Sequence, residues 1–185
     1  MSLTPRIGGE VRHGPHVGLD LVRLFGAGLA AMLLQTTVSP HIGVLGAHPD
    51  FVLIIVVCVA LLRGAEVGAV FGFVVGGLVS VLLFEPAGIG AFVMVTIGYL
   101  SGRYAETVDL SPGLLPVIAV LAASLLGGVM YALAQFLLER QVPAYYVATR
   151  VLVPMAVLNT LLAAPVYLVV HSLFGGEHHA RVLEA

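Results

Sequence analysis

The chain has 185 residues, of which 59% are hydrophobic and only 10% are charged, and its formal net charge at pH 7 is −2. An ordinary soluble domain carries about 25% charged residues, so this chain has too few charges to cover the surface of a soluble protein of its size. The mean hydropathy of +1.07 indicates a membrane protein whose surface meets lipid. The near-zero net charge argues against nucleic acid as a partner.

Six apolar segments follow one another along the chain and predict an all-α, polytopic bundle of about six membrane spans. They cover approximately residues 21–38, 51–62, 67–84, 89–104, 114–138 and 151–174. Each segment is continuously apolar, whereas the strands of a membrane barrel alternate between apolar and polar residues, so helices are the better interpretation. We predict one transmembrane domain over residues 21–174, with a flexible cytoplasmic tail before it (1–20) and a short cytoplasmic tail after it (175–185).

The second segment, FVLIIVVCVALL, is too short to be decisive. As a helix, its residues 51–62 cover about 18 Å, whereas the hydrocarbon core of a bilayer is roughly 30 Å thick. The flanking residues 47–50 and 63–66 can extend this helix to the membrane interfaces, which favours a short span joined tightly to the third segment. A bundle of five spans, in which one of these two segments is merged or demoted, stays open.

The arginines predict the orientation of the bundle. With six spans and the N-terminus inside, the inner side holds six arginines and the outer side holds two, in agreement with the positive-inside rule. The inner set is Arg6, Arg12, Arg23, Arg63, Arg103 and Arg181, and the outer set is Arg140 and Arg150. Both termini are therefore expected in the cytoplasm.

Small residues recur every four positions in the third segment, GAEVGAVFGFVVGGLVS. On a helix this spacing puts a groove without side chains along one face, and small residues allow membrane helices to approach closely. The pattern predicts a packing surface toward the bundle itself or toward a partner protein. The residues of this surface are Gly64, Gly68, Gly72, Gly76, Gly77 and Ser80, and a second ridge in the fourth segment contains Gly90, Gly98 and Gly102.

Polar residues near or within the spans are the other candidates for function, because ionisable and polar groups are costly in lipid. The candidates are Asp50, Arg63, Glu85, Arg103 and Asn159. For Asn159 a hydrogen bond between helices is favoured over contact with a ligand, and most of the charged residues are expected to be solvated or to bind head groups. No nucleophile–base set, phosphate loop or metal motif is recognisable, so we expect no enzyme, no catalytic residue, no cofactor and no metal.

Two stretches resemble a known family, the rod shape-determining membrane protein MreD. They are LQTTVSPHIGVLGAHPDFVLIIVVCVALLRG and GAVFGFVVGGLVSVLLFEPAGIGAFVMVTIGYLSGR, which together cover roughly residues 33–103. The chain departs from the family at one position: MreD proteins often carry an aspartate after the glycine-leucine pair of the third helix, where this chain has Ser80. Glu85 lies five residues later and is a possible substitute for that acid.

The resemblance implies a bacterial inner-membrane scaffold of the cell-elongation machinery. Proteins of this family act with the bitopic protein MreC and connect the actin-like MreB filament with the glycosyltransferase RodA and its transpeptidase. The family is similar in expected architecture to the substrate-binding components of energy-coupling-factor vitamin transporters, which supplies the alternative function. Those components dock a partner through small residues of the first helix, a spacing that Ala27 and Ala31 share. The short outer loops favour the scaffold, for which no small-molecule substrate is expected.

Overall fold

The computed structural model describes residues 16–43, 46–84, 87–108, 113–138 and 151–174. Within these ranges the regular elements are all helices, and six of them are α-helices. In chain order the elements are α1 (His16–Leu33), the π-helical turn η1 (Leu34–Val38), the 3-10 turn η2 (Ser39–His41), α2 (Phe51–Arg63), α3 (Ala65–Leu82), α4 (Ala87–Thr107), α5 (Leu114–Leu137) and α7 (Val153–Phe174).

Four of these helical segments are long and apolar enough to cross a membrane: residues 19–41, α3, α5 and α7. The fourth helix, α4, has 21 residues but is more polar toward its C-terminal end, where Ser101, Arg103 and Glu106 lie. The prediction of an all-helical, polytopic membrane protein is therefore confirmed. The first helix begins at His16 rather than at Leu21, and residues 1–15 and 175–185 of the predicted tails lie outside the described residues.

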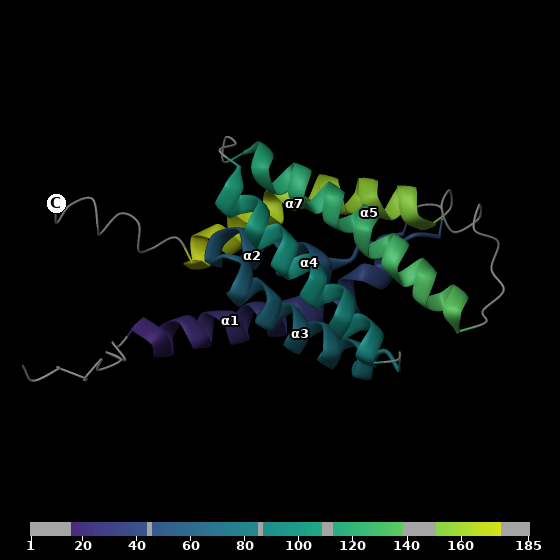
Figure 1. Ribbon diagram of the computed structural model, residues 1–185, viewed down its shortest axis with the longest axis horizontal. Coiled ribbons are helices and arrows are strands. Elements are labelled where there is room, and N and C mark those ends of the chain that lie inside the picture. The colour runs from purple at the N-terminus through teal and green to yellow at the C-terminus, as the bar shows by residue number, and fades with distance from the viewer. Residues whose placement is uncertain (1–15, 44–45, 85–86, 109–112, 139–150, 175–185) are drawn as a thin grey trace, which may run out of the picture.

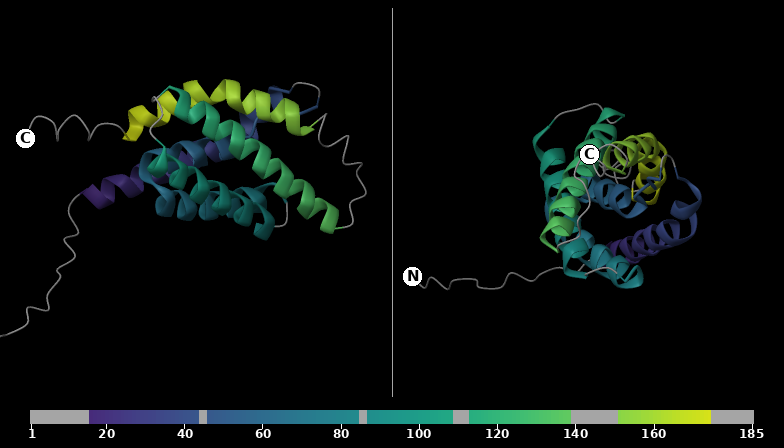
Figure 2. Two further views of the ribbon diagram at one scale, coloured as in Figure 1. Left: turned by 45° about the horizontal axis from the view of Figure 1, so that its top comes forward. Right: turned by 90° about the vertical axis from the view of Figure 1, so that its right-hand side faces the viewer.

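The short helix α2 forms the centre of the bundle. Every residue from Phe51 to Ala60 is buried, on all faces of the helix. A helix that is hydrophobic all round is expected to be enclosed by other helices or by lipid, and here α1, α3, α4, α5 and α7 surround it. Figure 2 shows this arrangement end-on, with α2 inside a ring of helices. The 13 residues of α2 cover about 20 Å, which is less than a bilayer core.

The flanking residues 47–50 and 64–66 do not extend α2, contrary to the expectation from the sequence. Residues 47–50 do not extend the helix, because the Asp50 carboxylate accepts a hydrogen bond from the Leu53 N–H (2.9 Å) and caps the helix there. Pro49 also disfavours a helical conformation for the residue before it. At the other end, Gly64 alone joins α2 to α3; its φ of +88° is a conformation that only glycine adopts readily.

The outer helices pair in a simple way around α2. In Figure 1, α3 and α4 run side by side as a hairpin, and α5 and α7 form a second pair. The first helix, α1, lies along α2 and α3, and the turns η1 and η2 follow it, with η1 in contact with α2. α5 packs against α2, α4 and α7, and its C-terminal half lines the cavity described below.

Candidate functional site

Polar side chains from three helices meet the beginning of α2. The first N–H groups of a helix have no partner within it, and here they are bonded by side chains. The Asp50 N–H donates to Asn159 Oδ1 of α7 (2.8 Å), and the Phe51 N–H donates to Gln35 Oε1 of η1 (2.9 Å). Asn159, which is fully buried, also donates through Nδ2 to Ser124 Oγ of α5 (3.0 Å). We call Gln35, Asp50, Ser124 and Asn159 the polar cluster.

The turn η2 is fastened to the same place. Ser39 is buried and donates through its hydroxyl to the Pro49 carbonyl (2.8 Å), and His48 Nδ1 lies 3.1 Å from the Ser39 carbonyl. The π-helical turn η1 just before it carries Gln35. π-Helical turns occur frequently at functional sites, and this one places the Gln35 amide against the start of α2.

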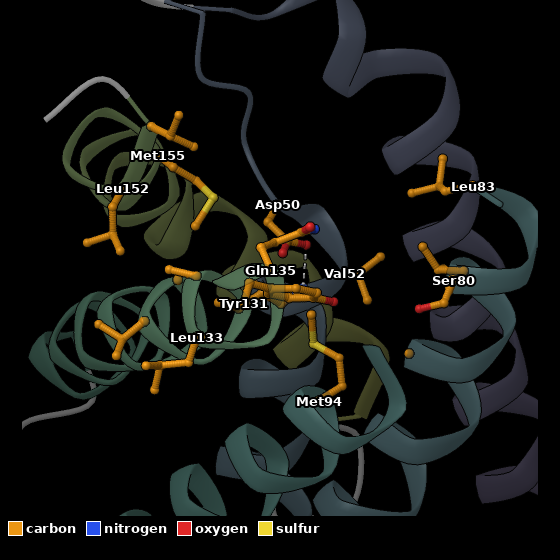
Figure 3. A pocket seen from close by; sticks show the side chains of 18 of the residues that line it. Asp50, Val52, Ser80, Leu83, Met94, Tyr131, Leu133, Gln135, Leu152 and Met155 are labelled. Carbon is orange, nitrogen blue, oxygen red and sulfur yellow. Dashed lines mark hydrogen bonds between the residues drawn. The ribbon is translucent and has the colours of Figure 1, made fainter. Parts of the chain in front are cut away.

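A cavity of about 700 Å³ lies beside the polar cluster. It is bounded by the beginning of α2, the last turns of α3, the first half of α4, the C-terminal half of α5 and the beginning of α7. Figure 3 shows Ser80 and Leu83 on one side and Leu133, Leu152 and Met155 on the other. The walls are mainly apolar, and polar groups are confined to a few lining residues: Gln35, Asp50, Ser80, Tyr131 and Gln135.

The small-residue ridges of α3 and α4 face each other. A Cβ atom added to Gly72 would lie 2.3 Å from the Met94 carbonyl oxygen, and one added to Gly98 would lie 2.2 Å from the Gly68 carbonyl oxygen. Cβ atoms on three further residues of these ridges, Gly68, Gly76 and Gly102, would also come within 2.8 Å of the facing helix. The two backbones are therefore in direct contact, and these glycines pack against residues of the same chain.

The remaining four residues of the small-residue ridges have other positions or roles. Gly77 lies at the edge of the interface, where an added Cβ would be in ordinary van der Waals contact with Ala91 Cβ of α4 (3.8 Å). Gly64 forms the joint between α2 and α3. Ser80 is buried, lines the cavity, and its Oγ would lie 1.9 Å from a Cβ on Gly90, so the small residue at Gly90 makes room for Ser80.

Charged residues gather at the opposite end of the bundle. The guanidinium of Arg63 at the end of α2 makes two hydrogen bonds to the Asp20 carboxylate of α1, one of them 2.9 Å long, and stacks over the ring of Phe174 with 5.0 Å between Cζ and the ring centroid. Arg103 of α4 donates to Glu106 (2.9 Å), which in turn accepts from the Ala65 N–H of α3 (3.1 Å).

The structure thus divides the five predicted polar candidates. It brings Asp50 and Asn159 into the polar cluster, places Arg63 and Arg103 at the other end, and Glu85 lies outside the described residues. Sequence reasoning did not select the partners of these residues, which are Ser124, Asp20 and Glu106. Helix crossings bring Ser124 and Asp20 to Asn159 and Arg63, whereas Glu106 lies three residues after Arg103 in α4.

Other polar residues of the spans bond within their own helices. Thr36, Thr96 and Thr160 each donate to the carbonyl of the residue four positions earlier. Gln135 differs from them, because its Oε1 is buried and has no hydrogen-bond partner among the described residues. This unpaired acceptor belongs to the lining of the cavity.

Comparison with known proteins agrees with the resemblance seen in the sequence. No curated protein and no solved structure gives a significant match, so the expected likeness to vitamin-binding transporter components stays a prediction. The family model described as the rod shape-determining protein MreD matches residues 20–175, from α1 through α7. This match confirms the predicted family, and the chain belongs to the rod shape-determining MreD family.

Proposed function

We propose that this protein is a non-catalytic scaffold of the bacterial cell-elongation complex in the inner membrane. In this role it binds the bitopic protein MreC and links the MreB cytoskeleton to peptidoglycan synthesis by RodA and its transpeptidase. The observation that carries the proposal is the family match over residues 20–175, because that family determines rod shape and is not a known enzyme family. The fold supports a scaffold, since its described residues are almost entirely membrane helices.

The surface that meets MreC lies outside the small-residue ridges. Gly68, Gly72 and Gly76 touch α4, and Ala27 and Ala31 of α1 are buried inside the chain. A partner helix must therefore pack on the outward faces of the bundle, which carry large exposed apolar side chains. One such residue on each of four helices is Phe25 (α1), Phe73 (α3), Phe92 (α4) and Leu168 (α7).

Co-purification tests both the binding and its location. The tagged chain is co-expressed with MreC, and each of these four residues is changed to alanine in turn, which removes apolar contact without filling the core. We expect MreC to be recovered with the unchanged chain and lost with the alanine variants of one face, while the other variants serve as matched controls. Recovery of MreC no better than that of an unrelated bitopic protein would contradict the proposal.

A second candidate function is vitamin capture as the substrate-binding component of an energy-coupling-factor transporter. The cavity of about 700 Å³ favours it, because the predicted orientation places this end of the bundle at the outer side, where such components bind substrate. The mainly apolar lining disfavours it, because a few placed polar groups usually give such sites their specificity. A thermal shift of the purified protein at nanomolar concentration of one vitamin from a panel would establish this function in place of the scaffold.

A further inference from the structure

The cavity beside the polar cluster has the construction of a binding site for one end of an amphiphile. Its walls come from two helix pairs that separate at this end, α3 with α4 and α5 with α7 (Figure 3). Its volume of about 700 Å³ falls within the roughly 300–1,000 Å³ typical of small-molecule sites. By comparison, a membrane-spanning helix about 10–12 Å wide and about 30 Å long fills roughly 3,000 Å³, so the cavity is too small for one.

The rim of the cavity is apolar and reaches the outer surface. Leu133 and Phe136 of α5 and Leu83 of α3 line the cavity, and they are respectively 59%, 76% and 44% exposed. In a bundle that spans a membrane these side chains meet hydrocarbon. A ligand would therefore enter from the lipid, and its chain would lie against apolar residues farther in, such as Met94 and Leu152.

One polar group of the cavity is an acceptor without a partner in the described part of the chain. Gln135 Oε1 is buried without a partner among the described residues, and a buried unpaired acceptor costs about 1–3 kcal/mol. A donor on a ligand would remove that cost. The Asp50 carboxylate lies on the same wall and brings a negative charge. Its Oδ1 already caps α2, so the positive end of that helix dipole is occupied.

The described lining offers no basic side chain to an anion. Among the described residues that form the cavity, none is a lysine, arginine or histidine, and Asp50 is the one ionisable carboxylate. Phosphate and carboxylate head groups are recognised by arginine, lysine or helix N-termini, and the single helix N-terminus here is taken by Asp50. The lining thus favours a head group that donates hydrogen bonds and carries no negative charge.

We propose that this cavity binds a neutral, hydroxyl-bearing, single-chain lipid of the monoacylglycerol class. The glycerol hydroxyl donates to Gln135 Oε1, and the acyl chain lies between α5 and the α3–α4 pair and leaves through the rim at Leu83 and Phe136. This site is independent of the scaffold function proposed above.

Native mass spectrometry of the full chain tests this site directly. The protein is released from lauryldimethylamine oxide, a detergent without a hydroxyl group, and titrated with 1-oleoylglycerol, with oleate and with oleoyl lysophosphatidic acid. These three probes share one chain and differ in head group. We expect a saturable one-to-one adduct with 1-oleoylglycerol, and adducts at least tenfold weaker with the two anions.

Two variants test whether the lipid adduct forms in the cavity. Gln135→Leu keeps the volume of the side chain and removes the acceptor, so we expect binding to weaken about fivefold, the value of one ordinary hydrogen bond. Ala132→Phe fills the cavity from α5 and should abolish the adduct. Thr96→Val is the matched control, because Thr96 bonds within its own helix and does not line the cavity.

The proposal fails on any of three results. It fails if the two anions bind as tightly as 1-oleoylglycerol, if no saturable adduct forms, or if Ala132→Phe leaves the adduct unchanged, since the lipid then lies on the outer surface. Monodispersity of each variant in detergent is measured alongside. If Gln135→Leu does not fold, the filled cavity of Ala132→Phe and the comparison of head groups still decide the outcome.

Discussion

At the scale of single residues, the first turn of α2 shows how a helix can begin inside a membrane protein. Lipid offers no hydrogen bonds, so an unbonded N–H at that depth costs several kcal/mol. Asn159, Gln35 and the carboxylate of Asp50 supply acceptors for three of these groups. Gln35, Asp50 and Asn159 therefore serve the N-terminus of a buried helix.

Asn159→Leu should destabilise the protein by about 1–3 kcal/mol. Leucine has a similar size but leaves the Asp50 N–H and the Ser124 hydroxyl without their present partner, and unsatisfied buried groups carry a penalty of that order. Unfolding by titration with SDS measures the change. Thr160→Val at the next position is the control, because Thr160 bonds only to the Ala156 carbonyl of its own helix and should change stability little. Equal losses of stability in the two variants would contradict the argument that the hydrogen bonds of Asn159 stabilise the bundle.

The ion pair between Asp20 and Arg63 should couple the ends of α1 and α2 by about 1–2 kcal/mol. Both side chains are largely buried, at 27% and 22% exposure, and the guanidinium binds the carboxylate through two nitrogens. A double-mutant cycle with Asp20→Asn and Arg63→Gln measures this energy. The same cycle on the exposed pair Arg103–Glu106 should give a clearly smaller coupling, because solvent screens an exposed ion pair. A coupling as small for the first pair would contradict this reasoning.

At the scale of elements, the structure depends most on the contact between α3 and α4. Glycines on one helix lie against backbone carbonyls of the other, with Gly72 against Met94 and Gly98 against Gly68. Such close approach gains van der Waals contact along the whole hairpin, which is the main attraction between helices in lipid. The single residue Gly64 then connects this hairpin to the buried helix α2.

Gly72→Ala should destabilise this hairpin by about 2–3 kcal/mol, because the added methyl group would lie 2.3 Å from the Met94 carbonyl oxygen and the backbones would have to separate. The matched control is Gly77→Ala in the same helix. There the nearest atom is 3.8 Å away, and alanine is a better helix former than glycine. We expect the control to leave the melting temperature unchanged or slightly raised, and a comparable loss in both variants would contradict the assignment of the interface.

How much of these elements the sequence predicts depends on which physical signal it carries. Continuous hydropathy located the six helices, and the spacing of Gly68, Gly72 and Gly76 indicated a packing face. The sequence could not tell which helix that face meets, since small residues fit many partners. Nor could it show that α2 is central: Val56 and Ile54 are equally suited to lipid and to a protein core. The cavity depends on how α5 crosses its neighbours α2, α4 and α7, which is a property of tertiary packing.

At the scale of the whole molecule, charge separates the two ends of the bundle. The described arginines, Arg23, Arg63 and Arg103, all lie at the end away from the cavity. At the cavity end, Asp50 is the one charged residue among those described. An excess of arginine marks the cytoplasmic side of a membrane protein, so the cavity and the polar cluster face the outer half of the membrane in the orientation that we propose.

Cysteine labelling in spheroplasts tests this orientation with little background, because the single native cysteine, Cys58, is fully buried in α2. Ile42→Cys places a thiol just after η2, at the cavity end, and Gly113→Cys places one just before α5, at the opposite end; both positions are exposed. A membrane-impermeant maleimide should label Ile42→Cys in intact spheroplasts, label Gly113→Cys only after permeabilisation, and leave the unchanged chain unlabelled. The reverse labelling pattern would show that the bundle has the opposite orientation in the membrane. It would also direct the cavity toward the cytoplasm, where an outer-facing capture of vitamins is impossible, whereas entry of a lipid from the side would remain open.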